Sequence, residues 1–292
     1  MIVVTGATGS VGRHVTAGLL AQGHKVRALT RDPARASIPW QAEVVRGDLS
    51  QPDDLGDALR GARAVYLMAM GGAPRRFAEL AERCGVERIV VLSTSDVLDD
   101  VERRPDAVAE AHAAFEHAVA RTGMRWTFLR PNEFAGNSLH WAPQIMAGDV
   151  VRAPYPLART APIHERDIAA VAVLALTQDG HHGAKYVLTG PRAITHADQL
   201  DLIGAAIGRT LRMEEIPADQ AREQMTRYAP PAIVEAVLGR LAAVVHQPST
   251  PTDTVERVTG RPPYSFADWA REHAADFRSS PATLASTSPV DT

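Results

Sequence analysis

The chain has 292 residues, of which 45% are hydrophobic and 22% are charged, and its formal net charge is -3. This charge argues against a nucleic-acid-binding protein, which normally presents a basic face. No apolar run approaches the roughly 20 residues that a membrane span needs, and a single cysteine, Cys84, excludes an internal disulfide. Residues 1–3 already begin an apolar strand, so no signal peptide is expected. We therefore expect a cytoplasmic protein with no membrane or nucleic-acid partner.

The first half of the chain alternates short apolar runs with helical patterns, which is typical of a doubly wound parallel α/β sheet, the Rossmann arrangement. Strands are predicted at residues 1–5, 25–30, 42–46, 63–69, 88–94 and 124–130. Helices are predicted between them, at residues 10–22, 52–60, 73–84 and 105–122.

The pattern changes after Pro131. The next predicted elements alternate helix and strand, at residues 134–147, 150–153, 165–177 and 184–189. The rest of the chain up to residue 277 is mostly helical, with helix starts at Thr195 and Ser265. Within it, the stretch 225–245 is either ordinary core or a lid.

These patterns predict two domains and a tail. Residues 1–150 form the sheet domain, which the strand near 184–189 rejoins. Residues 151–278 form a smaller, mainly helical substrate domain, and the small, polar tail 279–292 is expected to be disordered.

The most specific signal is the run Val3-Val4-Thr5-Gly6-Ala7-Thr8-Gly9-Ser10-Val11-Gly12. An apolar strand leads into glycines spaced G-x-x-G-x-x-G, and an amphipathic helix follows. Glycines in that turn let backbone N–H groups approach a pyrophosphate, and the helix N-terminus favours the negative charge. The segment therefore predicts a dinucleotide-binding turn, with Gly6, Thr8, Gly9, Ser10, Val11 and Gly12 in contact with the cofactor.

The end of the second strand indicates which dinucleotide is bound. An acidic residue there usually binds the ribose 2′-hydroxyl of NAD, but this chain has Thr30 followed by Arg31, with Arg35 one turn later. Guanidinium groups bind a 2′-phosphate well, so NADP(H) is the predicted cofactor. Further contacts are expected where the next strands end, at Asp48, Leu49, Met68, Ala69 and Met70.

At this point the chain resembles the atypical, NmrA-like branch of the short-chain dehydrogenase/reductase superfamily. The resemblance rests on the glycine turn and on segments that follow it along the chain, at residues 31–33, 47–49, 93–95, 129–134, 166–169 and 188–191. It implies an NADP(H)-binding Rossmann domain with a small substrate domain. The branch includes reductases of ketones, quinones and conjugated alkenes as well as catalytically silent redox sensors.

The usual catalytic pair of the superfamily, Tyr-x-x-x-Lys, is absent. No tyrosine of this chain has a lysine four residues later. The resemblance to the superfamily places Val108 at the position of the tyrosine and His112 at that of the lysine. The proton donor could then be Ser95 or Thr94, His112, water, or an acidic hydroxyl of the substrate itself. We predict Ser95 and His112 as catalytic residues.

The remaining expected site residues follow the fifth and sixth strands. Ser93, Pro131, Asn132 and Phe134 are assigned to the cofactor, and Ser95, Phe134, Asn137 and His164 to the substrate. Asp167 is expected to cap the following helix. His181 and His182 lie in a glycine loop without a third ligand, so no metal site is expected.

Three functions remain open. The leading hypothesis is an NADPH-dependent reductase of a carbonyl or quinone in an apolar aromatic molecule, in its narrowest form a ketoreductase that tailors an aromatic polyketide in antibiotic biosynthesis. The second is a non-catalytic NADP(H) sensor that regulates a protein partner. An epimerase or isomerase ranks third, because it also needs a positioned acid–base pair. The protein is expected to be a monomer or a homodimer.

Overall fold

The computed structural model describes residues 1–69, 71–99 and 106–278. Met70 and the tail 279–292 lie outside the described residues, so the predictions for them stay predictions. Within the described residues, no helix is both long enough and apolar enough to cross a membrane.

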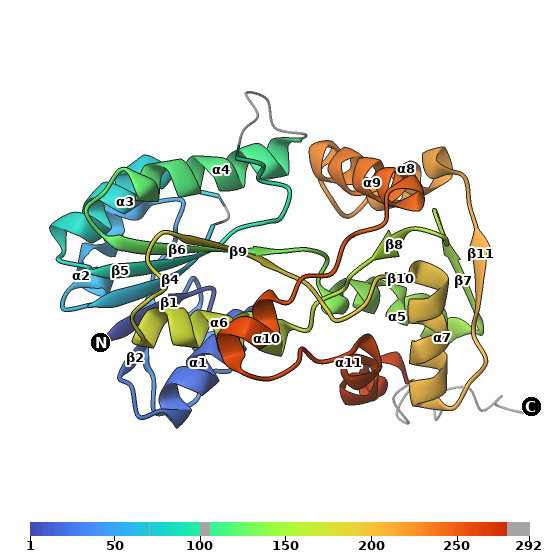
Figure 1. The fold of residues 1–292 in the computed structure, drawn as a ribbon, viewed down its shortest axis with the longest axis horizontal. Helices are drawn as coiled ribbons and strands as arrows, with labels where there is room; N and C mark the ends of the chain where they lie inside the picture. Colours follow the sequence, from blue (N-terminus) through green and yellow to red (C-terminus); the bar gives the residue numbers. More distant parts are fainter. Residues whose placement is uncertain (70, 100–105, 279–292) are drawn as a thin grey trace, which may run out of the picture.

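Seven parallel strands form the main sheet, in the order β3-β2-β1-β4-β5-β6-β9 (Figure 1). In that order the strands are Glu43–Arg46, Val26–Thr30, Ile2–Thr5, Ala64–Met68, Arg88–Leu92, Arg125–Pro131 and Ala184–Leu188. The winding direction reverses between β1 and β4, and ligands of open α/β sheets bind at the carboxyl ends of strands beside such a reversal. The Rossmann prediction is confirmed, including the six strands of the first half.

Helices cover both faces of this sheet (Figure 1). One face is covered by α1 (Gly12–Ala21), α6 (Glu165–Thr177) and α10 (Thr254–Thr259), whose apolar side chains share one core with the strands. The other face is covered by α2 (Gly56–Leu59), α3 (Pro74–Arg83) and α4 (Ala107–Ala120). In α1 the apolar spacing that predicted the helix places Val15 and Leu19 in the core, both fully buried.

The second half of the chain builds a smaller unit beside the carboxyl ends of the strands (Figure 1). Its helices are α5 (Ala142–Ala147), α7 (His196–Ile207), α8 (Ala218–Met225), α9 (Pro231–His246) and α11 (Phe266–Glu272). Its strands are β7 (Val150–Ala153), β8 (Arg159–Thr160), β10 (Ile194–Thr195) and β11 (Arg212–Glu215). This unit also contains the 3-10 helices η3 (Ala135–Trp141) and η4 (Ala274–Phe277). Two further described 3-10 helices, η1 (Pro33–Arg35) and η2 (Pro52–Leu55), lie in the first half of the chain.

This unit differs from the predictions in several places. The two-residue strands β8 and β10 were not predicted. The helix predicted near 134–147 is split into η3 and α5, with Pro143 in the first turn of α5, where its missing N–H costs least. Strand β11 was not predicted, because its sequence has no apolar alternation and its partner β7 lies some 60 residues earlier.

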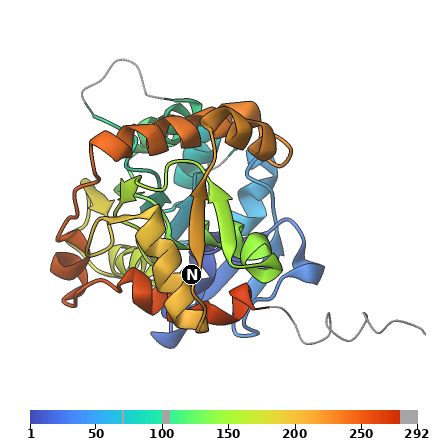
Figure 2. The ribbon, with the colours of Figure 1, turned by 90° about the vertical axis from the view of Figure 1, so that its right-hand side faces the viewer.

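Helix α9 brings the second unit close to the sheet. It packs beside α4 (Figures 1 and 2), and a small core beneath α8 and α9 contains Ile216, Ala221, Val234 and Leu238. The segment considered as core or lid therefore has a buried face.

Candidate functional site

The turn between β1 and α1 is shaped by its glycines. Gly6 has φ +59°, in the left-handed region that favours glycine. A Cβ at Gly12 would collide with the carbonyl oxygen of Gly6, and one at Gly9 would lie 3.1 Å from that oxygen. The turn therefore closes more tightly than residues with side chains would allow, which lets a phosphate approach the backbone.

The start of α1 lacks the usual capping side chain. Val11 occupies the N-cap position without a side-chain hydrogen bond, and the first turn carries no acidic residue. Thr8 and Ser10 are exposed beside it, whereas Val11 itself is buried. The N–H groups of this turn and the positive end of the helix dipole are thus available to a bound anion.

Polar groups gather where β2 and β3 end. Arg31 and Arg35 are exposed there, as a site for a 2′-phosphate requires. Hydrogen bonds from the backbone and side chain of Ser50 hold the pKa of Asp48 below its usual value, and the nearby charge of Arg31 lowers it further. Leu49 follows and packs partly into the core.

The end of β4 touches the glycine turn. The N–H of Met68 donates to Thr5 Oγ1 at 2.8 Å, and a Cβ at Gly6 would lie 3.1 Å from Met68 Sδ. Ala69 is buried behind Met68. Of the predicted contacts on this strand, Met70 lies outside the described residues.

The ends of β5 and β6 are joined by hydrogen bonds. Ser95 N donates to the carbonyl oxygen of Pro131 at 3.0 Å, and Asn132 Nδ2 donates to Ser95 Oγ at 3.3 Å. Ser93 is 4% exposed, and its hydroxyl has no hydrogen-bond partner among the described residues. These four predicted site residues therefore lie together at the edge where a nicotinamide would be expected.

His112 lies on the sheet-facing side of α4. Glu116, one turn further along α4, binds Arg130, and α4 runs antiparallel to β6, so His112 lies nearer the carboxyl ends of the strands. Its side chain is largely buried, and Nδ1 has no partner among the residues the structure describes. Burial lowers the pKa of His112, and the charges of Glu116 and Asp96 oppose this only in part.

Two charged groups at this edge were missed by sequence reasoning. Arg240 of α9 donates from Nη1 to Asp96 Oδ2 at 2.8 Å, directly beside Ser95. Glu133 follows Asn132, and its Oε1 lies 3.6 Å from Nε2 of the buried His196. No local pattern marks Arg240, because Asp96 is 144 residues away and 29 of the 31 basic residues are arginines.

The residues after β6 were predicted to meet both cofactor and substrate. Phe134 is half-buried, packs against the core and bridges to Ile163. Asn137 is exposed at η3. Both stay candidates, since neither position conflicts with the role assigned to it.

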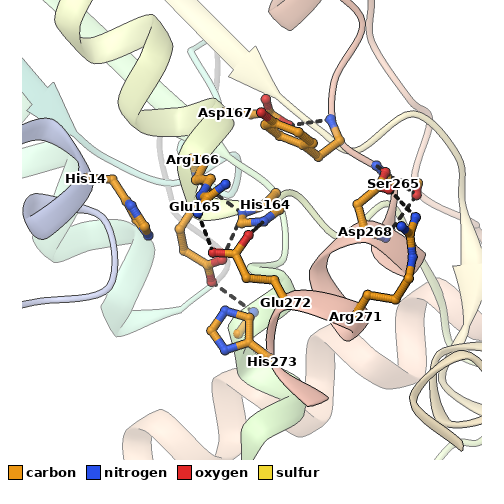
Figure 3. A network of polar contacts seen from close by, with 12 residues as sticks. His14, His164, Glu165, Arg166, Asp167, Ser265, Asp268, Arg271, Glu272 and His273 are labelled. Atoms are coloured by element: carbon orange, nitrogen blue, oxygen red, sulfur yellow. Dashed lines mark hydrogen bonds and ion pairs between the residues drawn. The ribbon is translucent and has the colours of Figure 1, made fainter. Parts of the chain in front are cut away.

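His164 does not fit the predicted substrate-facing role. It is 2% exposed and lies in a polar network between α6 and α11, with Nε2 3.3 Å from Glu272 Oε2 (Figure 3). Its Nδ1 accepts the N–H of Arg166 at 3.2 Å, which makes His164 the N-cap of α6. Burial lowers the pKa of His164 to about 4, against the opposing charge of Glu272.

The predicted capping role of Asp167 is wrong, because His164 is the N-cap of α6. Asp167 lies fully buried in the first turn of the helix. It accepts a hydrogen bond from Tyr264 N at 2.8 Å and pairs with Arg261 at 2.8 Å. It therefore ties α6 to the segment before α11.

The two adjacent histidines have structural partners. His181 Nδ1 lies 2.9 Å from the hydroxyl of Tyr186, and His182 Nδ1 accepts the N–H of Trp126 at 3.2 Å. Among the described residues, no group of three or more His, Cys, Asp or Glu side chains is placed to hold a metal ion.

Two surface hollows lie at the opposite edge of the sheet. Both are lined by Arg88 and Arg125, the first residues of β5 and β6. Asp179 binds both guanidinium groups. The two hollows are therefore separate from the candidate site, which lies at the carboxyl ends of the strands.

Comparison with known proteins agrees with this geometry. Residues 6–179 match the family model described as NAD(P)H-binding. A relative from Streptomyces griseus, named (4-alkanoyl-5-oxo-2,5-dihydrofuran-3-yl)methyl phosphate reductase, is 41% identical over 290 residues, covering 95% of this chain and 99% of the relative. The NAD(P)H azoreductase of Xenophilus azovorans is 32% identical over 286 residues, covering 95% and 99%.

Solved structures show the same fold. The NADPH-dependent quinone oxidoreductase of Escherichia coli superimposes with a TM-score of 0.77 at 23% identity, covering 93% of this chain and 99% of that one. The chain therefore belongs to the NAD(P)H-binding family and is an NAD(P)H-dependent oxidoreductase.

Proposed function

We propose that the protein is an NADPH-dependent reductase of quinones or other conjugated carbonyl compounds, acting on a small, apolar, cyclic substrate. The observation that carries the proposal is the composition of the edge formed by β5, β6 and α4. It offers the hydroxyl of Ser95 and the amide of Asn132, with Val108 and His112 where the superfamily has its tyrosine and lysine.

NADPH is the proposed form of the cofactor. The glycine turn and the uncapped start of α1 fit the pyrophosphate, and Arg31 and Arg35 fit the 2′-phosphate. When bound, NADPH supplies a hydride and leaves as NADP⁺.

The missing tyrosine favours conjugated acceptors over isolated ketones. An isolated ketone that takes up a hydride becomes an alkoxide, a strong base that needs a proton at once. A quinone becomes a phenolate, whose conjugate acid has a pKa of about 10, so the anion is stable enough to form first and to take its proton from the solvent afterwards. Hydrogen bonds from Ser95 and Asn132 would orient such an acceptor without having to protonate it.

The names of the relatives support this substrate class. They describe the phosphate ester of an unsaturated lactone that carries an acyl group, an azo compound and a quinone. All three classes contain a conjugated system that accepts two electrons. The reductase names also favour an enzyme over the non-catalytic sensor.

The narrower hypothesis of a ketoreductase for an aromatic polyketide also rests on the missing tyrosine–lysine pair. A phenolic hydroxyl of such a substrate could supply the proton that the chain lacks. It predicts faster reduction of hydroxylated aromatic ketones than of the same ketones without the hydroxyl.

The test is NADPH oxidation followed by stopped-flow absorbance with quinones, enones and hydroxylated aromatic ketones, paired with calorimetry of NADPH binding. Turnover with quinones or enones and slow reaction with isolated ketones is the expected result. Tight NADPH binding without turnover of any acceptor would overturn the reductase and leave the sensor.

A further inference from the structure

Arg240 of α9 reaches the edge where the reaction would occur. Its Nη1 donates to Asp96 Oδ2 at 2.8 Å, and Asp96 is held in turn by Thr94, whose hydroxyl lies 3.2 Å from the same oxygen. Thr94 and Asp96 flank Ser95. The guanidinium is therefore anchored on the residue that directly follows Ser95, whose hydroxyl was assigned to the substrate.

The same guanidinium also acts on the end of β6. Burial alone would raise the pKa of Glu133, but hydrogen bonding to His196 and Thr160 and the charge of Arg240 outweigh this and lower it. Glu133 directly follows Asn132. The charge of Arg240 therefore acts on Asp96 after β5 and, more weakly, on Glu133 after β6.

Arg240 keeps most of its hydrogen-bonding capacity. Among the described residues, only its Nη1 has a hydrogen-bond partner, and its side chain is 38% exposed. Arg130 differs, because all three of its guanidinium nitrogens are bound by Glu116 and Asp99 and its side chain is 6% exposed. A guanidinium has five N–H donors, so Arg240 can bind a further oxygen without leaving Asp96.

We propose that Arg240 binds the carbonyl oxygen of the substrate on which negative charge develops, and so replaces the electrostatic part of the missing tyrosine–lysine pair. The substrate gains a hydride at carbon, its conjugated π electrons move to the carbonyl oxygen, and the resulting phenolate or enolate is later protonated by water. The net change is substrate plus NADPH plus a proton giving reduced substrate and NADP⁺.

A guanidinium suits this role better than an acid would. It does not lose its proton in proteins, so it stabilises an oxyanion but cannot protonate it. It is also held by Asp96 before the reaction begins, which avoids a costly rearrangement as charge develops. This inference rests on the proposed function, because only conjugated acceptors give an anion stable enough to form without a proton donor at the site.

The test compares four proteins with one quinone that the wild type reduces. Arg240→Gln should lower kcat by about 100-fold, the range seen when one oxyanion donor is removed. Arg240→Lys keeps the charge and should recover part of that loss. Arg222→Gln, which removes another ion pair of the α8–α9 unit, to Glu235, should change kcat less than twofold, or roughly 0.4 kcal/mol.

A binding measurement separates this role from a structural one. Absorbance titration of 4-nitrophenol bound in the presence of saturating NADP⁺ reports the pKa of a phenol at the substrate position. Arg240→Gln should raise that pKa by about 1. Asp96→Asn breaks the same ion pair but keeps the guanidinium, and should lower it.

The outcomes are distinct. Unchanged kcat and an unchanged phenol pKa in Arg240→Gln would overturn the role of Arg240 while leaving the reductase intact. A wild-type protein that reduces no quinone contradicts the proposed function instead. If Arg240→Gln does not fold, the phenol pKa in Arg240→Lys and Asp96→Asn decides, because equal values in both variants and the wild type would also reject the proposal.

Discussion

The helices α1 and α7 begin in opposite ways. In α7, Thr195 Oγ1 accepts the N–H of Asp198 at 3.0 Å and Asp198 Oδ2 accepts the N–H of Thr195 at 2.8 Å, a complete capping box. In α1 the cap is Val11, without any side-chain bond. A capped start stabilises the fold, whereas an open start that glycines keep accessible is a binding site whose donors a ligand must satisfy.

The largest effect is expected on NADPH affinity, from a substitution that changes the backbone at the uncapped start of α1. Gly12→Ala places a Cβ against the carbonyl oxygen of Gly6, so the turn must shift and its N–H groups no longer point toward the pyrophosphate. We expect NADPH affinity to fall at least 100-fold, about 2.7 kcal/mol, in isothermal titration calorimetry. Gly56→Ala is the control, because its Cβ meets nothing within 4 Å; equal losses in both variants would contradict a specific role for Gly12.

The next effect concerns the two arginines beyond β2. Arg31→Ala combined with Arg35→Ala should weaken NADPH binding by about 10- to 100-fold, the value of hydrogen bonds to a charged group. NADH binding should be nearly unchanged, because it lacks the 2′-phosphate. Arg60→Ala, at another exposed arginine, serves as control; a parallel loss of NADH affinity in the double variant would argue against the 2′-phosphate contact.

A smaller effect per pH unit is expected at the start of α6, where the cap is a buried histidine. Folding keeps His164 neutral down to a pKa of about 4, whereas the unfolded chain protonates it near its usual value of about 6.5. The unfolded state thus binds more protons between these values, so stability is lost as pH falls from about 6.5 to 4, by at most about 1.4 kcal/mol per pH unit.

His164→Asn keeps a capping side chain but removes this titration. Urea unfolding at several pH values should therefore show a shallower acid slope for the variant than for the wild type. His246→Asn, at an exposed histidine of α9, should keep the wild-type slope. Identical slopes in all three proteins would show that His164 does not contribute.

The smallest effect is expected at the capped start. Thr195→Ala should lower the free energy of unfolding by about 1 kcal/mol, and Thr195→Ser should recover most of it. NADPH affinity should stay the same in both. A change in affinity as large as that of Gly12→Ala would remove the distinction between a capped start that stabilises and an open start that binds.

The sequence by itself determined those features whose geometry depends only on residues close together in the chain. The glycine turn, the apolar face of α1 and the capping residues Thr195 and Ser265 are each specified within a few positions, because turns, helix faces and caps depend on local backbone geometry. The alternation of strands and helices extended this to the Rossmann sheet, since parallel strands need crossover helices.

Only the tertiary structure decided which distant residues meet. Asp96 and Arg240 are 144 residues apart, and β11 finds its partner β7 across α7. The burial of His164 beneath α11 is equally invisible in its own segment. Such contacts depend on how whole elements pack, which no local spacing encodes, and so the sequence predicted the glycine turn, whereas only the fold placed Arg240 against Asp96.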